Sequence, residues 1–329
     1  MRADVQDILS RYGAQVEARL AAAVPRRGGD VLSEAAWHHL DGGGKRLRSA
    51  LCLAACEALG GRAEQALDFA VAVELLHNML LVHDDLEDRD RFRRDRPAVW
   101  VRYGEANAIN VGDWLFALAC RSALRTPAPD AVRLALVEDF IGAYEKTVEG
   151  QALDLDRRGA PDFTVEQYVE LATLKTGHYL ALGLVGGARI AGADERMIAT
   201  LRAFGRHAGP AFQVRDDVID LTAGKGRNGR TGCDIEEGKP SALYAWALAH
   251  AAPDDRTRLI AIMRAPREAT PAEDVRWAMA LYERTGATAF AGRFADELMA
   301  KARAALAVLP GAGGEALQRL ADYLTERTT

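Results

Sequence analysis

An apolar helical segment that runs directly into a cluster of aspartates limits what this chain can fold into. Between residues 71 and 82, apolar residues recur at helical spacing on two stripes: Val71, Leu75, Met79 and Val82 on one, and Val73, Leu76 and Leu80 on the other. A helix that is apolar on most sides belongs at the centre of a protein. The segment continues without a break into His83-Asp-Asp-Leu-Glu-Asp88. We therefore expect a central helix that carries carboxylates at one end.

Helical periodicity recurs along almost all of the 329 residues, and no alternating segment of strand length stands out. Breaks fall where glycine and proline gather, at residues 25–29, 41–44, 60–61 and 310–314. Two capping boxes are indicated, one by Thr164 with Gln167 and one by Thr270 with Glu273, where Pro271 would take the first helical position. The chain is therefore predicted to be all-α, a bundle of about ten to twelve helices without a sheet.

A second aspartate cluster, Arg215-Asp-Asp-Val-Ile-Asp220, repeats the DDxxD spacing of the first. Residues three and four apart share a helix face, so each cluster projects three carboxylates from one patch: Asp84, Asp85 and Asp88, and Asp216, Asp217 and Asp220. Facing one another, these charges would repel unless cations neutralised them. Hard oxygen ligands suit Mg²⁺, which proteins usually hold with a few carboxylates and substrate phosphates. The pair predicts a Mg²⁺-diphosphate site between two helices.

Basic residues suited to a diphosphate accompany the aspartates. Gly42-Gly-Gly-Lys45-Arg-Leu-Arg48 offers backbone N–H groups at a helix start together with two cationic side chains, Lys45 and Arg48, although its spacing is not that of a P-loop. Arg93 and Arg94 follow the first cluster. Because adjacent residues on a helix or turn point about 100° apart, they could serve two different anions.

Thr176, Gln213 and His77 are further candidate site residues, and Gly177 is a candidate kink. Gly177 in Lys175-Thr-Gly177 interrupts a helical pattern, and a kink there would expose backbone carbonyls and the Thr176 hydroxyl. Gln213 lies three residues before the second cluster, on the same helix face. His77 lies one heptad before Asp84, also on the face of its cluster.

Composition excludes several classes of protein. The formal net charge of −5 leaves no global nucleic-acid footprint. The four cysteines are too few and too scattered for a disulfide framework, and Cys52 and Cys56 lack a matching pair of zinc ligands. The first residues lack the apolar core of a signal peptide, and no uncharged run reaches the roughly 18 apolar residues of a membrane span. We expect a cytoplasmic protein with no transmembrane segment and no nucleic-acid partner.

In chain order, these motifs resemble those of the trans-isoprenyl diphosphate synthases (polyprenyl synthetases), and the resemblance covers essentially the whole length. The landmarks are Gly43-Gly-Lys-Arg-Leu-Arg48, His83-Asp-Asp-Leu-Glu-Asp88, Arg93-Arg94, Arg96-Pro97, Gly112-Asp113, Gly150-Gln151 with Asp154, Lys175-Thr-Gly177, Phe212-Gln-Val-Arg-Asp-Asp217 with Asp220, Asp234, and Gly238-Lys-Pro240. A single motif of this kind is weak, whereas the ordered set is specific.

The resemblance implies a single isoprenyl diphosphate synthase domain, residues 1–329, with its helices around a central cavity, and a homodimer. It implies a Mg²⁺-dependent trans-prenyltransferase, with three Mg²⁺ ions when substrate is bound. Such an enzyme condenses isopentenyl diphosphate with dimethylallyl, geranyl or farnesyl diphosphate. The reaction would be ionisation, condensation and elimination, with the released diphosphate as the base.

Residue roles carry over by position from the family. Those expected to hold Mg²⁺ on the allylic diphosphate are Asp84, Asp88 and Asp216, supported by Asp85, Asp217 and Asp220, of which Asp220 is a further candidate ligand. The allylic diphosphate itself would be contacted by Arg93, Lys175, Thr176 and Gln213, and Lys175 is counted among the catalytic residues with the aspartates. Isopentenyl diphosphate would be held by Lys45, Arg48, His77 and Arg94.

The sequence departs from the family pattern at four positions. Ser49 stands where proline is usual, Asp95 where glycine is usual, and Trp100 where many members have histidine. A phosphate-binding lysine is often found five residues before Asp234, where this chain has Gly229. Three residues are candidates for its role, namely Lys225, Arg227 and Arg230.

Product length should depend on the helix before Asp84. In the family, the fourth and fifth positions before the first aspartate set the depth of the pocket; here they are Leu80 and Met79, with Leu76 one turn deeper. Large aromatic side chains there imply fifteen carbons and alanine implies long chains. Met and Leu are intermediate, which favours geranylgeranyl diphosphate, then farnesyl diphosphate. A longer polyprenyl product stays open, because the residues facing this helix are not known from sequence.

Three other functions compete with this one. A class I terpene cyclase on the same fold typically keeps one aspartate triplet and would not need the four isopentenyl-binding residues. A non-catalytic subunit of a heteromeric synthase tends to lose a triplet, whereas both are present here. A helical metal-dependent phosphohydrolase would need several His-Asp pairs, and His83-Asp84 stands alone. The sequence therefore favours the prenyltransferase.

Overall fold

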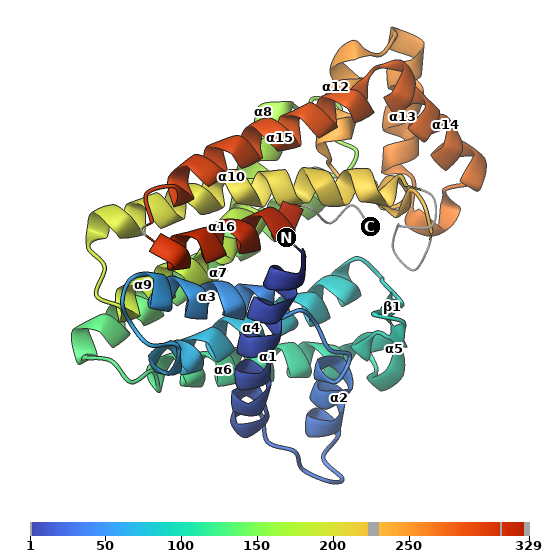
Figure 1. Cartoon of the computed structure of the whole chain (residues 1–329). Coiled ribbons are helices and arrows are strands. Elements are labelled where there is room, and N and C mark those ends of the chain that lie inside the picture. Colours follow the sequence, from blue (N-terminus) through green and yellow to red (C-terminus); the bar gives the residue numbers. More distant parts are fainter. Residues whose placement is uncertain (1, 223–229, 310, 326–329) are drawn as a thin grey trace. The chain divides into compact units, whose positions relative to one another are not determined.

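The computed structural model describes residues 2–222, 230–309 and 311–325, and these are helical almost throughout (Figure 1). The α-helices are α1 Arg2–Ala23, α2 Val31–Leu40, α3 Leu47–Ala58, α4 Ala63–Glu87, α5 Val99–Tyr103, α6 Glu105–Leu124, α7 Asp130–Asp156, α8 Val165–Ala172, α9 His178–Ile190, α10 Glu195–Asp220, α11 Cys233–Glu236, α12 Ala242–His250, α13 Pro253–Arg264, α14 Ala272–Arg284, α15 Ala287–Leu306 and α16 Gly311–Thr325. A π-helix spans Thr173–Gly177 and a 3₁₀-helix spans Arg267–Ala269.

The prediction of an all-α chain is confirmed, with two local differences. Within the described residues there are sixteen α-helices rather than ten to twelve, because short helices such as α5 and α11 carry too few residues to show periodicity. A small antiparallel hairpin pairs β1 (Phe92–Arg93) with β2 (Arg96–Pro97). Strands of two residues leave no alternating pattern in a sequence, so they were not expected.

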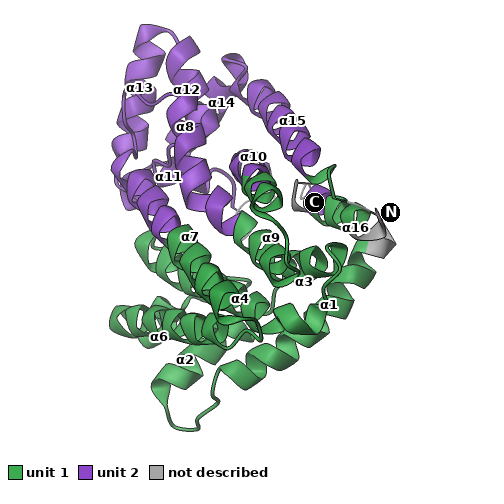
Figure 2. Cartoon of the chain, turned by 90° about the vertical axis from the view of Figure 1, so that its left-hand side faces the viewer, with its two compact units in different colours: residues 1–144, 181–202, 306–320 green, residues 145–180, 203–305, 321–329 purple. Residues whose placement is uncertain are grey.

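By its internal contacts the chain divides into two compact units, coloured separately in Figure 2. Unit 1 consists of residues 1–144, 181–202 and 306–320, and unit 2 of residues 145–180, 203–305 and 321–329. The first aspartate cluster belongs to unit 1 and the second to unit 2. Each unit is described separately below.

In unit 1, α4 is the central helix that its sequence predicts. It packs against α1, α2, α3, α5 and α6, and Val73, Leu75 and Leu76 are fully buried. Among the described residues α4 alone is long and apolar enough to cross a membrane by length and composition, and 67% of its most apolar window is buried inside the protein. At Gly112 the approach of α6 is so close that a Cβ atom there would lie 1.9 Å from Nε2 of His83.

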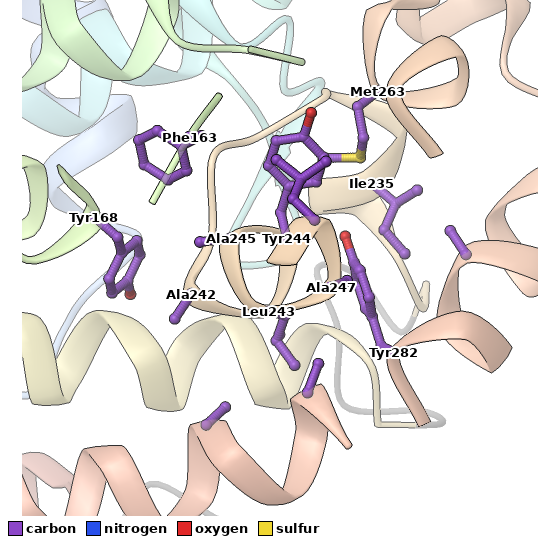
Figure 3. Packing of buried hydrophobic residues seen from close by; sticks show 14 of the residues in the cluster. Phe163, Tyr168, Ile235, Ala242, Leu243, Tyr244, Ala245, Ala247, Met263 and Tyr282 are labelled. Carbon is purple, nitrogen blue, oxygen red and sulfur yellow. The ribbon is translucent and has the colours of Figure 1, made fainter. Parts of the chain in front are cut away.

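In unit 2, a hydrophobic cluster built from α8 and α10–α15 forms the core (Figure 3). Its largest fully buried side chains include Tyr168, Tyr244 and Tyr282. The capping box predicted at the start of α8 is confirmed, since Gln167 N–H donates to Thr164 Oγ1 at 3.3 Å and Thr164 N–H to Gln167 Oε1 at 3.1 Å.

The second predicted capping box, before α14, is wrong. Pro271 is itself the N-cap residue, without a side-chain cap bond, and does not take the first helical position. The Thr270 hydroxyl instead donates to the carbonyl of Pro266 at 3.3 Å. The 3₁₀-helix Arg267–Ala269 brings the Pro266 carbonyl within reach of the Thr270 hydroxyl. The hydroxyl therefore bonds to this carbonyl instead of capping α14.

Candidate active site

The first aspartate cluster lies where α4 ends. Asp84 and Asp85 occupy the last turn, and Asp88 is the C-cap residue, whose N–H donates to the carbonyl of Asp84 at 2.8 Å. Asp85 and Asp88 are buried, and Asp84 is half-buried. The helix therefore brings the three residues together as the DDxxD spacing predicts.

Arg93 from β1 pairs with Asp85. Its Nε donates to Asp85 Oδ1 at 2.8 Å, and its terminal nitrogen also contacts that oxygen. Burial raises the pKa of Asp85 to about 6, although the Arg93 charge acts to lower it. The second oxygen, Oδ2, is buried and accepts no hydrogen bond from any described residue. A buried carboxylate oxygen without a donor is a suitable ligand or acceptor for an incoming cation complex.

The hairpin that carries Arg93 and Arg94 turns through two residues with positive φ. Arg94 has φ 54° and Asp95 has φ 60°, as the type I′ turn of a two-residue hairpin requires. This explains why glycine is usual at position 95, and aspartate is among the few other residues that adopt this conformation readily. The Arg94 guanidinium contacts the carbonyl oxygen of Gly43, so the hairpin reaches the glycine-rich loop.

A cluster of cationic groups surrounds His77 in unit 1. Burial, followed by the charges of Arg48 and Arg94, lowers the pKa of His77 well below its usual value, so the ring is neutral. Arg48 and Arg94, which are also predicted for isopentenyl diphosphate, are thus near enough to His77 for their charges to act on its ring. The fourth residue predicted for this substrate, Lys45, is exposed on the adjoining loop.

Two residues whose contacts the sequence did not reveal, His38 and Trp100, hold the hairpin in place. His38 interacts through Nε2 with the Pro97 carbonyl at 2.8 Å, while Arg96 and Arg102 donate to its Nδ1 at 3.2 and 3.0 Å. The Trp100 indole donates to the carbonyl of Asp90 at 2.7 Å. Trp100 therefore fastens the segment after the aspartate cluster to α5.

In unit 2, Lys175 and Thr176 lie in the π-helix Thr173–Gly177. The kink predicted at Gly177 is thus a π-bulge, an irregularity often found at functional sites. Helix α7 packs closely against it: a Cβ atom on Gly150 would lie 2.2 Å from the backbone nitrogen of Lys175. The ammonium group of Lys175 pairs with buried Asp154 at 2.8 Å.

The second aspartate cluster lies at the end of α10, and its central member, Asp217, accepts hydrogen bonds from three side chains. Gln213 donates to Asp217 Oδ1 at 3.1 Å, Lys239 donates to the same oxygen at 3.2 Å, and Tyr168 donates to Oδ2 at 3.0 Å. Burial raises the pKa of Asp217, and the Lys239 charge opposes this effect. Thr176 Oγ1 lies 3.5 Å from Gln213 Oε1, which links the π-helix to the cluster.

The segment that contains Asp234 contacts the end of α10. The N–H of Asp234 donates to Asp220 Oδ2 at 3.0 Å, and Lys239 lies 3.4 Å from Asp234. Of the three candidates for the missing loop lysine, Lys225 and Arg227 lie outside the described residues. Arg230 pairs with Glu236 at 2.7 Å. Lys239, which belongs to the landmark Gly238-Lys-Pro240, contacts Asp217 of the cluster.

Within each unit, the donor set suits a cation only when further ligands are supplied. Within the described part of the chain, no group of three or more His, Cys, Asp or Glu side chains is placed to hold a metal ion. Mg²⁺ is commonly bound by one or two carboxylates together with substrate phosphates, so this finding agrees with a site that a diphosphate completes. The hard carboxylate oxygens fit the ion.

Comparison with known proteins identifies the family. Residues 29–282 match the family model of polyprenyl synthetases. A short chain isoprenyl diphosphate synthase of Methanothermobacter thermautotrophicus is 36% identical over 326 residues, 98% of this chain and 99% of that protein. A geranylgeranyl pyrophosphate synthetase from Pyrococcus horikoshii has a TM-score of 0.90 at 33% identity, with 99% of both chains covered. The chain belongs to the polyprenyl synthetase family, as its motifs indicate.

Proposed function

We propose that this protein condenses isopentenyl diphosphate with an allylic diphosphate to make an all-trans prenyl diphosphate. One observation carries the proposal: each aspartate cluster at a helix end is accompanied within its own unit by cationic side chains. In unit 1 these include Arg93, Arg94 and Arg48, and in unit 2 they include Lys175 and Lys239. A cyclase would not need the basic cluster around His77.

The aspartate clusters would bind Mg²⁺, with three ions when substrate is present. Asp84, Asp88 and Asp216 would be the main ligands, and Asp220 is a further candidate. When bound, the ions would neutralise the allylic diphosphate and stabilise it as a leaving group. Asp85 and Asp217 would then act mainly through their buried pairs with Arg93 and Lys239, which hold those cations in place.

The two diphosphates would be bound by different sets of residues. We assign the allylic diphosphate to Arg93, Lys175, Thr176 and Gln213, and isopentenyl diphosphate to Lys45, Arg48, His77 and Arg94. Neutral His77 can donate to or accept from a phosphate without adding charge, whereas the guanidinium groups supply charge. Separate anion sites leave the alkene of isopentenyl diphosphate free to attack the allylic cation once it ionises.

The product we propose is geranylgeranyl diphosphate, with farnesyl diphosphate next and a longer chain as the alternative. Known relatives include a geranylgeranyl diphosphate synthase of Methanosarcina mazei and a geranylfarnesyl diphosphate synthase of Natronomonas pharaonis. On α4, Leu76 and Met79 are buried and Leu80 is half-buried. Side chains of medium size at these positions support a pocket of medium depth.

We further propose that residues 1–329 act as one catalytic domain in a cytoplasmic homodimer. The apolar segment 108–119 of α6 is half buried within unit 1, with Ala108, Val111, Leu115 and Ala119 fully covered and Ile109 exposed. Large apolar side chains exposed on α7 offer a surface for a second copy: Leu134, Ile141, Val148 and Leu155 recur at every seventh residue. Sedimentation of the purified protein would decide between monomer and dimer.

The test of the activity uses purified protein, Mg²⁺, labelled isopentenyl diphosphate and each allylic primer in turn. Discrete isoprenoid alcohols after dephosphorylation are expected. Asp84→Asn and Asp216→Asn should each lower the rate by at least about 100-fold, while Asp254→Asn, an exposed acid in the first turn of α13, should not. Release of diphosphate from a prenyl substrate without isopentenyl incorporation would favour the cyclase instead.

A further inference from the structure

Arg46 lies between two residues assigned to isopentenyl diphosphate, Lys45 and Arg48, yet its own side chain is directed inward. The side chain is 3% exposed, and the residue has φ 48° as the N-cap of α3. Such a left-handed conformation is unfavourable for a residue other than glycine. It persists only where the surroundings fix it. The contacts of Arg46 should therefore determine the shape of the loop.

Those contacts converge on a buried carboxylate. Arg46 Nη1 donates to Oε1 of Glu74 on α4 at 2.8 Å, and Arg46 Nε donates to Glu17 on α1 at 2.6 Å. The Ser49 hydroxyl lies 2.9 Å from Glu74 Oε2 and 3.0 Å from the Ala70 carbonyl; with one proton it donates to one of them at a time. Glu74 is 2% exposed. The loop and the start of α3 are thus tied to the central helix.

The loop is held from a second direction by Arg94. A Cβ atom on Gly44 would lie 3.2 Å from the Arg94 guanidinium and 3.4 Å from Nη1 of Arg46. Arg94 also contacts the Gly43 carbonyl. The backbone at Gly44 therefore lies close to two arginines: Arg94, which is assigned to substrate, and Arg46, whose side chain is buried. A shift of Arg46 would therefore change the positions of Lys45, Arg48 and Arg94.

A buried ion pair is weak evidence for stability, because desolvation offsets most of the attraction. What it supplies here is a fixed geometry: Glu74 accepts from Arg46, which is in a strained conformation, and from Asn78 at 3.3 Å, and its second oxygen lies within hydrogen-bond distance of Ser49. Ser49 is also the residue that departs from the usual proline. Proline has no hydroxyl, so in this chain the serine supplies a contact that the common pattern lacks.

We propose that Glu74, through Arg46 and Ser49, is the positioning residue of the loop 43–48 and sets the affinity for isopentenyl diphosphate. None of the three residues is among those assigned to bind either diphosphate. The proposal rests on the proposed function for its kinetic consequence. The loop geometry itself can be tested without turnover.

Glu74→Gln keeps the size of the side chain and removes its charge, and Ser49→Ala removes only the hydroxyl. We expect Glu74→Gln to raise KM for isopentenyl diphosphate about tenfold or more, with kcat and the KM for the allylic primer changed less than about threefold. Ser49→Ala should raise the same KM about threefold. Asp139→Asn is the matched control: its side chain is 10% exposed in the same unit and pairs with Arg189 and Arg202, both at 2.5 Å, away from the loop.

Hydrogen–deuterium exchange of the free protein is the second readout. The N–H of Gly43 bonds to the Leu40 carbonyl and that of Ala50 to the Arg46 carbonyl, so peptides covering 43–50 report on the loop. Both loop variants should speed exchange there, and Asp139→Asn should not.

Unchanged exchange in folded Glu74→Gln would overturn the positioning role. Faster exchange with an unchanged KM for isopentenyl diphosphate would overturn its effect on substrate. An equal rise in both KM values would indicate a general loss of structure and also reject the proposal. Wild-type protein that incorporates no isopentenyl diphosphate would refute the proposed function. In that case exchange still decides the loop geometry, and calorimetric titration with inorganic diphosphate decides the effect on anion binding.

Discussion

The hydroxyl of Tyr168 donates a hydrogen bond to Oδ2 of Asp217 at 3.0 Å, and both residues are buried. Tyr168 comes from α8 and belongs to the hydrophobic cluster of unit 2 (Figure 3). Burial and the neighbouring Asp217 raise the pKa of Tyr168 well above its usual value, so its hydroxyl keeps its proton and acts as a donor. The hydrophobic core thereby fixes one face of a carboxylate in the second aspartate cluster.

Removing this donor should destabilise the protein more than removing a similar bond to a neutral acceptor. Tyr168→Phe should lower the free energy of unfolding by about 1.5–3 kcal/mol, because the bond goes to a charged group. Tyr244→Phe is the comparison, since the Tyr244 hydroxyl donates to the Ala160 carbonyl at 2.9 Å and should cost only about 0.5–1.5 kcal/mol. Urea unfolding measures both. Equal losses would mean that the carboxyl of Asp217 is neutral in the folded protein.

The glycines of α7 offer a test of how the π-helix is held. Gly150→Ala places a methyl group where the Lys175 backbone lies, so we expect a loss of about 1–3 kcal/mol in unfolding free energy and a higher KM for the allylic primer. Gly142→Ala, on the same helix with nothing within 4 Å of its Cβ position, should instead gain about 0.5–1 kcal/mol. The prediction fails if Gly150→Ala is tolerated like Gly142→Ala in both measurements.

The turn of the hairpin after the first cluster predicts which substitutions at position 95 lower the free energy of unfolding. Asp95 has φ 60°, so a β-branched side chain there is strained whereas glycine is not. Asp95→Val should lose about 1–2 kcal/mol in unfolding free energy, and Asp95→Gly should stay within about 1 kcal/mol of wild type. Thermal unfolding of the two variants side by side measures this. If valine were tolerated as well as glycine, the turn would have a different backbone.

Stability should fall with acid because of His39 on α2. Burial, followed by the charges of Arg94 and Arg93, lowers the pKa of His39 to about 3. In the unfolded chain His39 takes up a proton near pH 6.5, whereas in the folded protein its ring stays neutral at that pH. The folded state therefore loses up to about 1.4 kcal/mol per pH unit as pH falls from about 6.5 towards 3.

The test of the His39 effect is a comparison between variants. Urea unfolding at pH 7.5, 6 and 5 should show wild type losing stability faster than His39→Gln, whose side chain cannot take up a proton. The same comparison with His250→Gln, at a solvent-exposed position of α12, should show no such divergence. Parallel pH curves for wild type and His39→Gln would contradict the expected pKa.

Most features set by neighbours in sequence were predicted correctly, although the capping box expected from Thr270 and Glu273 was not. The apolar stripes gave the central helix α4, and the Thr164–Gln167 spacing gave the start of α8, because both depend on residues within a turn or two. The DDxxD spacing placed each carboxylate triplet on one helix end for the same reason.

Features set by tertiary contacts could not be predicted in the same way. Tyr168 and Asp217 are 49 residues apart, and nothing local marks Tyr168 as a donor to that carboxylate. The kink at Gly177 was expected, but its π-helical form and its close packing against Gly150 were not. The burial of Arg46 was not predicted, because its partners Glu17 and Glu74 lie far from it in the sequence.

The proposed product length depends on which face of α4 meets the growing chain. Leu80 lies one turn before Asp84 and is half-buried, so Leu80→Phe should shorten the main product by about one isoprene unit, which is comparable in length to one 5.4 Å helical turn. Leu81 is also half-buried but points about 100° away, and Leu81→Phe should leave the product unchanged. Chromatography of the dephosphorylated products measures both. A shift of equal size in the two variants would mean that the bulk of the phenylalanine ring, rather than the face of α4 on which it sits, changed the product, and Leu80 would lose its assigned role.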